Sequence, residues 1–230
     1  MIDLNARLIE YNDIADEARH FVFEADAEFT FLPGQFVSFS ELVDGKKVTR
    51  AYSIASPPHG NVFELCLNRV TQGKLSPRLF DMGIGDCIEM QGPLGYFVMR
   101  NPVNDTVFVA TGTGIAPFRA MLKSQLLHDS EHQFTLIFGV RYERNIMYQE
   151  EFEAMAAQHQ NFHFWPTLSR PESPWQGRTG HVQSHLMEAI GDRRDVDVYI
   201  CGLKLMVDDV RSRLKELGFD RKHIIYEKYD

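Results

Sequence analysis

The period of hydrophobic and polar positions changes near residue 100. Before that point apolar and polar residues alternate in short runs such as 20–25, 35–40 and 61–67, which is typical of half-buried strands. An Asp44-Gly45 pair between two such runs predicts a tight hairpin turn. Several short strands at close turn spacing predict a small closed antiparallel β-barrel.

After residue 100 the pattern predicts strands that alternate with helices. Strands are expected at 106–111, 134–140, 162–167 and 196–201, with helices at 117–128, 148–158, 181–190 and 203–217. Such alternation favours a parallel sheet covered by helices on both faces, with ligands at the carboxyl ends of the strands. We therefore expect two domains, residues 1–100 and 101–230, divided at the polar, Pro-containing segment 100–104.

Composition narrows the function classes. The 230 residues are 44% hydrophobic and carry a net charge of −8 without a basic run, so nucleic acid is not expected as a partner. No apolar run approaches membrane-spanning length, and no signal peptide is visible at the N-terminus. Three widely spaced cysteines, Cys66, Cys87 and Cys201, suit a reducing cytoplasm and exclude a four-cysteine iron–sulfur cluster.

A glycine turn joins the first strand of the second half to its helix. The segment Gly112-Thr113-Gly114 is followed by Pro117, which suits the first turn of a helix. Free amides and the helix dipole at such a turn can hold a pyrophosphate. The spacing Gly-x-Gly-x-x-Pro departs from the usual dinucleotide fingerprint, and a bare strand-to-helix connection is the alternative.

Two features of the first half are candidates for cofactor chemistry. Arg50 and Tyr52 share one face of a strand with Ser53 on the other, so they can offer a phosphate clamp beside a flat ring. A half-exposed strand with a solvated arginine is the alternative. Downstream, Ser76 is a suitable N-cap for a short helix, whose N-terminus would be open to an anion.

The carboxyl ends of the later strands carry further candidates. An Arg- and Tyr-rich loop begins at Arg141. Ser169, Arg170 and Arg178 can together bind a 2′-phosphate, because paired guanidiniums suit phosphate oxygens. Solvated loop arginines are the alternative.

Four segments resemble, in order and spacing, motifs of the ferredoxin–NADP reductase family. They are Arg50-Ala-Tyr-Ser-Ile-Ala-Ser, Gly73-x-x-Ser76, Gly92-Pro-Leu-Gly95 and Gly112-Thr-Gly-Ile-Ala-Pro117, and the likeness continues through the C-terminus. The resemblance implies a FAD-binding antiparallel barrel followed by a nicotinamide-nucleotide domain.

The resemblance assigns roles around FAD. It implies that Arg50 holds a FAD phosphate, that Tyr52 stacks on the isoalloxazine ring and that Ser53 hydrogen-bonds near the flavin N5. Backbone amides of the Gly73, Leu75 and Ser76 segment would take the FAD pyrophosphate.

The resemblance also assigns a catalytic set: Ser53, Cys201, Glu227 and Tyr229. The thiol of Cys201, before Gly202, would lie beside the reactive carbon of the nicotinamide, Tyr229 would cover the flavin and Glu227 would help relay protons. For Cys201 the alternative is inert packing, and for Tyr229 it is an ordinary frayed terminus. A Ser-Arg pair at 169–170 goes with NADP in the family, whereas Pro171 and the segment 175–180 resemble users of NADH, so NADPH is expected and NADH is possible.

The expected function is a FAD-dependent reductase that moves hydride from NADPH to flavin N5 and then single electrons to a separate ferredoxin or flavodoxin. The alternatives are a reductase of free flavin or small acceptors, and a non-catalytic electron-transfer or regulatory subunit of a larger oxidoreductase. Residues 1–100 hold 9 basic and 14 acidic side chains, so an acidic ferredoxin would need a local basic patch, for which Lys46, Lys47 and Lys74 are candidates.

No metal site is expected. The pairs His128/His132 and His159/His163 lack a third ligand at zinc-site spacing.

Overall fold

A computed structural model describes residues 2–128 and 131–229, and contacts between residues divide the chain into two units. One unit contains residues 1–99 and 116–124, and the other contains residues 100–115 and 125–230. No helix in the described ranges is both long and apolar enough to span a membrane.

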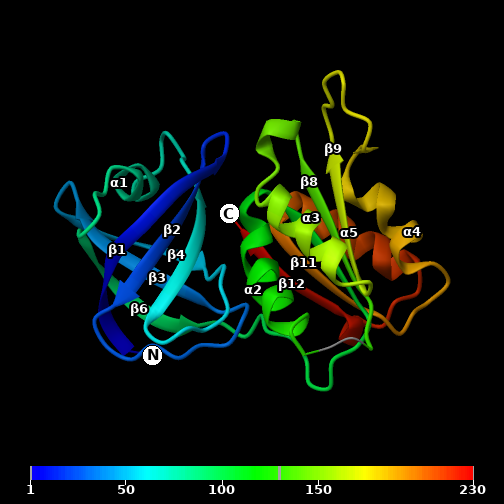
Figure 1. Ribbon diagram of the computed structural model, residues 1–230, viewed down its shortest axis with the longest axis horizontal. Coiled ribbons are helices and arrows are strands. Elements are labelled where there is room, and N and C mark those ends of the chain that lie inside the picture. The colour runs from blue at the N-terminus through cyan, green and yellow to red at the C-terminus, as the bar shows by residue number, and fades with distance from the viewer. Residues whose placement is uncertain (1, 129–130, 230) are drawn as a thin grey trace. The chain divides into compact units, whose positions relative to one another are not determined.

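The first unit is built on a six-stranded antiparallel sheet in the order β4-β3-β6-β1-β2-β5 (Figure 1). Its elements are β1 (Ile2–Ala15), β2 (Ala18–Ala25), β3 (Phe36–Val43), β4 (Lys46–Ser53), β5 (Val62–Asn68), α1 (Ser76–Phe80) and β6 (Cys87–Leu94). An antiparallel bridge between Ile54 and Leu65 joins the chain after β4 to β5, the strands at the two ends of this order. The predicted antiparallel barrel is therefore confirmed.

Alternation along the strands fills this barrel with aromatic rings. Phe23 packs edge-on against Phe39 at 5.0 Å and stacks with Phe63 at 5.8 Å between ring centroids, and all three are fully buried. At the hairpin between β3 and β4, Asp44 and Gly45 have φ angles of 51° and 72°. Positive φ at both central residues matches a type I′ turn, which the Asp-Gly pair favours.

The second unit is built on a parallel sheet in the order β10-β9-β8-β7-β11-β12. Its strands are β7 (Thr106–Thr111), β8 (Phe134–Val140), β9 (Phe162–Leu168), β10 (Arg178–Thr179), β11 (Asp197–Leu203) and β12 (Ile224–Tyr229). The helices along this half of the chain are η1 (Gly112–Ile115), α2 (Ala116–Gln125), η2 (Glu143–Asn145), α3 (Gln149–Gln158), η3 (Val182–His185), α4 (Leu186–Ile190), α5 (Lys204–Glu216) and η4 (Arg221–His223). The expected helix at 181–190 is divided between η3 and α4.

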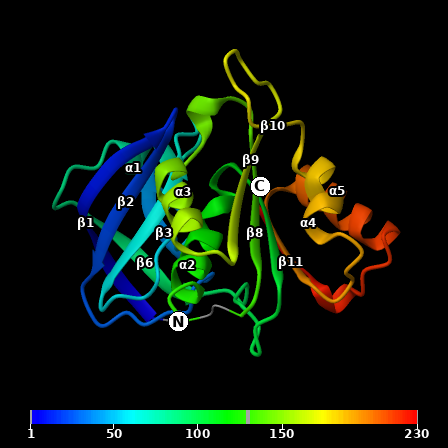
Figure 2. The ribbon, with the colours of Figure 1, turned by 45° about the vertical axis from the view of Figure 1, so that its right-hand side comes forward.

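Helices cover both faces of the parallel sheet, as expected (Figure 2). On one face Phe152 of α3 stacks on Phe164 of β9 with ring centroids 5.2 Å apart. On the other face residues of α4 and α5 form an apolar cluster with alternate residues of β7 and β11, among them Val109 and Ile200. Alternate strand residues therefore face different helices, because successive side chains point to opposite faces of a strand.

Most of helix α2 groups with the barrel unit although the chain enters it from β7 and η1. Arg119 of α2 is 6% exposed, donates to the carbonyl oxygen of Ala55 at 2.8 Å and pairs with the carboxylate of Glu64 at 2.5 Å. Phe118 packs on Phe97 with ring centroids 5.8 Å apart. A buried guanidinium with two acceptors thus anchors this helix to the first unit.

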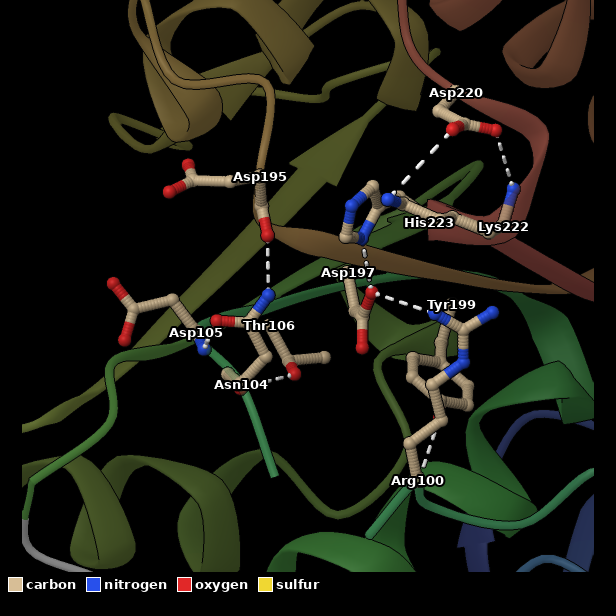
Figure 3. Close-up of polar contacts among 10 residues, drawn as sticks. All are labelled: Arg100, Asn104, Asp105, Thr106, Asp195, Asp197, Tyr199, Asp220, Lys222 and His223. Atoms are coloured by element: carbon tan, nitrogen blue, oxygen red, sulfur yellow. Dashed lines mark hydrogen bonds and ion pairs between the residues drawn. The ribbon is translucent and has the colours of Figure 1, made fainter. Parts of the chain in front are cut away.

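A polar cluster holds β12 against β11 at the amino end of the parallel sheet (Figure 3). The carboxylate of Asp197, which is 3% exposed, contacts His223 Nδ1 at 2.6 Å and accepts from Arg100 at 3.2 Å. The backbone amide of Arg100 donates to the hydroxyl of Tyr199 at 3.0 Å. This cluster fixes the start of β12, the strand that carries Glu227 and ends at Tyr229.

Candidate active site

The centre of the parallel sheet brings the glycine turn against Cys201. From β7 the chain adds β8, β9 and β10 on one side of the sheet and then β11 and β12 on the other side. The topological switch point of the sheet therefore lies between β7 and β11. A Cβ at Gly114 would lie 2.3 Å from the carbonyl oxygen of Cys201, and Gly112 adopts a φ of 55°. Only glycine allows this approach, which leaves the turn at the position where open parallel sheets bind ligands.

Thr111 is a polar group at this turn that the sequence analysis missed. Its hydroxyl oxygen is buried and has no hydrogen-bond partner among the described residues. A Cβ at Gly202, where φ is 143°, would lie 2.4 Å from that same oxygen. A buried hydroxyl without a partner is costly, so Thr111 is a candidate to bind a ligand at the end of β7. Its only signal in the sequence is its place directly before the glycine turn.

Cys201 and the C-terminal residues come together across β11 and β12. In the parallel register Cys201 lies opposite Glu227 and Leu203 lies opposite Tyr229. Burial raises the pKa of the Cys201 thiol well above its ordinary value, the charge of Glu227 raises this pKa further, and a hydrogen bond with Tyr229 opposes the shift. The thiol is therefore protonated at neutral pH and is not poised as a nucleophile.

The other expected nucleotide ligands gather at the carboxyl ends of β8, β9 and β10. The amide of Ser169 donates to Val140 at 3.0 Å, and the amide of Arg170 donates to Arg141 at 2.9 Å. Strand β10 pairs in parallel with the end of β9, with Arg178 opposite Thr167. Ser169, Arg170 and Arg178 thus occupy one edge of the sheet.

Arg178 differs from the free cation that the sequence suggested. Its guanidinium makes a two-pronged contact with the carboxylate of Glu188 in α4, at 2.5 and 2.6 Å, and lies 3.9 Å from the ring centroid of Trp165. Glu188 carried no signal in the sequence, because the two residues meet only once β10 and α4 are folded.

In the first unit, Arg50, Tyr52 and Ser53 occupy the end of β4. Tyr52 packs against Phe39 with ring centroids 5.7 Å apart, and burial raises the pKa of its phenol to about 12, partly offset by the nearby Arg50 charge. Arg50 is exposed, and the hydrogen bond recorded for its guanidinium goes to the carbonyl oxygen of Thr49 at 2.8 Å. Ser53 is 8% exposed. Arg50 is therefore a cation available to a phosphate, next to a half-buried ring.

The expectation that Ser76 caps α1 is wrong. Ser76 is the first residue of this helix and Leu75 is its N-cap, without a side-chain cap hydrogen bond. The Ser76 hydroxyl instead accepts from the backbone amide of Val70 at 3.0 Å. A Cβ at Gly73 would lie 2.9 Å from the carbonyl oxygen of Val70, so both residues shape the turn before the helix.

The remaining expected site residues are divided between the two units. Pro117 is the second residue of α2, within the segment that groups with the first unit, whereas Thr113 lies in η1 of the second unit. Lys47 forms an ion pair with Glu89, so its charge is already compensated. Ser53 belongs to the first unit and Cys201, Glu227 and Tyr229 to the second.

Each half of the chain matches a known family of oxidoreductase domains. Residues 5–99 match the oxidoreductase FAD-binding domain model, and residues 108–212 match the oxidoreductase NAD-binding domain model. The chain is 39% identical to ferredoxin--NADP reductase B of Sorangium cellulosum, over 98% of this chain and 97% of that protein. It is 31% identical to the toluate 1,2-dioxygenase electron transfer component of Pseudomonas putida, covering 88% of this chain and 60% of that protein.

A solved structure has the same two-domain fold. The Amycolatopsis cytochrome P450 reductase GcoB superimposes with a TM-score of 0.91 at 29% identity, covering 99% of this chain and 69% of that one. The two domain models indicate FAD and a pyridine nucleotide as cofactors. This chain therefore belongs to the ferredoxin–NADP reductase family of FAD-dependent oxidoreductases.

Proposed function

We propose that this enzyme oxidises NADPH with FAD and passes the electrons one at a time to a separate ferredoxin or flavodoxin. One hydride and its two electrons leave NADPH, two carriers each gain one electron, and one proton is released. The observation that carries the proposal is the contact of Gly114 with the Cys201 carbonyl. It sets the glycine turn, which would bind the pyrophosphate, beside the neutral thiol at the centre of the sheet.

The residues of the first unit fit FAD. When bound, FAD accepts a hydride and releases single electrons. The exposed Arg50 would hold a phosphate, and the half-buried ring of Tyr52 would stack on the flavin ring. Backbone amides around Gly73, Leu75 and Ser76 would take the pyrophosphate, and Ser53 would donate near the flavin N5.

The residues of the second unit fit a pyridine nucleotide. Amides of Gly112, Thr113 and Gly114, together with the start of α2 at Pro117, would hold its pyrophosphate, and the unpartnered hydroxyl of Thr111 would gain a partner. Further along the same edge of the sheet, after β8, β9 and β10, Arg141 and the cluster of Ser169, Arg170 and Arg178 would bind the adenosine part of the nucleotide. A 2′-phosphate on the ribose would meet Ser169, Arg170 and Arg178, which favours NADPH.

Cys201, Gly202, Glu227 and Tyr229 would form the hydride-transfer site. Cys201 needs no ionisation for this role, because hydride transfer depends on positioning and on exclusion of water. Tyr229 would cover the flavin, and Glu227 would help relay protons.

A ferredoxin-type acceptor is supported by the names of the relatives, a ferredoxin reductase and an electron transfer component. Because Lys47 is paired with Glu89, Lys46 and Lys74 are the stronger candidates to attract an acidic carrier. Charge reversal at Lys46 should raise the KM for an acidic ferredoxin and leave the reduction of a small dye unchanged.

Anaerobic mixing of the FAD-bound enzyme with NADPH or NADH tests the function. We expect fast bleaching of the flavin with NADPH, slower bleaching with NADH, and rapid reoxidation by ferredoxin or flavodoxin. If the reduced enzyme is reoxidised only by free flavin or small acceptors, the proposal that it passes electrons to ferredoxin or flavodoxin is refuted. A protein that takes up no FAD would refute the function.

A further inference from the structure

The carboxylate of Glu188 already occupies the side of Arg178 that a phosphate would use. The contacts of 2.5 and 2.6 Å join both terminal nitrogens of the guanidinium to the two carboxylate oxygens. Trp165 covers one face of the same guanidinium at 3.9 Å. The side chain of Arg178 is 29% exposed and that of Glu188 is 55% exposed, so solvent and ligands can reach the pair.

Phosphate and carboxylate compete for the same donors on an arginine. A guanidinium presents its donors as a planar fork that binds either group through two parallel hydrogen bonds. A 2′-phosphate carries more than one negative charge near neutral pH, so a carboxylate that stays beside Arg178 repels it. An adenosine ribose without that phosphate meets neither the competition nor the repulsion.

We propose that Glu188 determines coenzyme specificity by holding Arg178 and so weakening the binding of a 2′-phosphate relative to a 2′-hydroxyl. The proposal rests on the proposed function, since it needs a pyridine nucleotide at this edge of the sheet. Glu188 acts against NADPH by charge, while Arg170, whose guanidinium has no recorded partner among the described residues, gives the 2′-phosphate an uncontested cation.

The surroundings of Glu188 keep it charged. The hydrogen bond from Arg178 lowers the pKa of Glu188, burial opposes this shift, and the charges of Arg178 and His185 lower the pKa further. His185 lies one turn before Glu188 and contacts the hydroxyl of Thr167 at 3.0 Å. Glu188 therefore competes as a carboxylate throughout the neutral range.

Calorimetric binding of 2′-phospho-AMP and of AMP to the FAD-bound enzyme tests the proposal. We expect Glu188→Gln to tighten the binding of 2′-phospho-AMP by on the order of tenfold, the scale of one exposed ion pair plus a like-charge repulsion. AMP binding should not change. The same substitution should raise kcat/KM for NADPH relative to NADH by a similar factor.

Two controls separate competition from a general loss of charge. Glu216→Gln removes a carboxylate of α5 that is somewhat more exposed than Glu188 and pairs with Arg213 at 3.4 Å, and it should leave both affinities unchanged. In the Arg178→Ala background, Glu188→Gln should tighten the binding of 2′-phospho-AMP less than it does in the wild type. Only the repulsion between Glu188 and the phosphate is then removed, because the guanidinium for which the two compete is gone.

The outcomes distinguish this inference from the proposed function. An unchanged or weaker affinity of Glu188→Gln for 2′-phospho-AMP would refute the inference, and a weaker one would make Glu188 a support for Arg178. If wild type binds neither nucleotide and is not reduced by NADPH or NADH, the proposed function itself fails.

Discussion

Cys201 and Glu227 are in-register partners across the parallel strands β11 and β12. Burial of the thiol and, to a lesser extent, the charge of Glu227 raise its pKa well above the ordinary value, against the opposing hydrogen bond with Tyr229. The structure therefore combines a buried, neutral sulfur with a strand that ends two residues later in Tyr229. This combination suits a group that packs against a bound nicotinamide and does not attack it.

Cys87 and Cys201 should differ in reactivity, because one is exposed and the other is buried. Cys87 is exposed, whereas Cys201 is fully buried, so iodoacetamide at about pH 8 should label Cys87 quickly and spare Cys201 in the native protein. Peptide mass spectrometry measures both. Cys87→Ala should abolish the fast labelling. Labelling of Cys201 at a rate similar to Cys87 would contradict a protonated, inaccessible thiol.

Gly114→Ala should uncouple the pyridine nucleotide from the flavin. The added Cβ would lie 2.3 Å from the Cys201 carbonyl oxygen, so the turn must move away from β11. We expect flavin reduction by NADPH to fall on the order of a hundredfold, the usual effect of a small misplacement of reacting groups. Stopped-flow absorbance measures this rate, and dithionite should still reduce the bound FAD.

Gly191→Ala is the matched control for that substitution. Gly191 has a positive φ of 56°, which Gly114 does not share, and no atom lies within 4 Å of a Cβ built there. It should cost about 1 kcal/mol of stability and leave the rate of flavin reduction unchanged. Equal rates for the two variants would show that the contact of Gly114 with Cys201 does not matter for hydride transfer.

Arg50→Ala should weaken FAD binding without unfolding the barrel. The recorded hydrogen bond of the Arg50 guanidinium goes to the neighbouring Thr49 carbonyl, so little of the fold depends on it. Loss of a charge-assisted phosphate contact should weaken FAD binding about ten- to a hundredfold. Flavin fluorescence on titration of apoprotein measures the affinity.

Arg7→Ala controls for removal of a positive charge from the same barrel. Arg7 lies on β1 and pairs with Glu24, and its side chain is 56% exposed. We expect it to retain FAD as wild type does. Circular dichroism should report the same strand content for both variants, and an Arg50→Ala protein that binds FAD normally would refute the phosphate role.

Local patterns were sufficient to predict the architecture of both halves. The strand at 106–111 is found as predicted because six apolar or β-branched residues end at a glycine. The hairpin at Asp44-Gly45 is found because few residues other than Asn, Asp and Gly tolerate the required φ angles.

Pairings set by tertiary packing could not be predicted in this way. Ser76 looked like a helix cap, but the preceding turn brings Val70 within reach of its hydroxyl. Arg178 looked like a free phosphate ligand, but α4 places Glu188 against it. Ser76 does make a hydrogen bond and Arg178 does bind an anionic group, as their residue types suggested. Their partners could not be predicted, because they depend on how the chain folds around each residue.

Asp197→Asn should destabilise the second unit. The carboxylate is buried and satisfies both His223 and Arg100, so the substitution leaves two polar groups without their charged acceptor (Figure 3). We expect a loss of about 3 kcal/mol in the free energy of unfolding. Both tryptophans, Trp165 and Trp175, belong to this unit, so their fluorescence in urea reports its unfolding.

Asp220→Asn is the control for this loss, because the hydrogen bond and the ion pair of the exposed Asp220 carboxylate both go to Lys222: it accepts from the Lys222 amide at 3.1 Å and pairs with its ammonium group at 3.8 Å. It should cost about 1 kcal/mol or less. Flavin fluorescence, which would follow the first unit, should give the same midpoint in both variants. If Asp197→Asn leaves the tryptophan midpoint at the wild-type value, the cluster does not hold β12, and the position of Glu227 and Tyr229 must depend on contacts further along the strand.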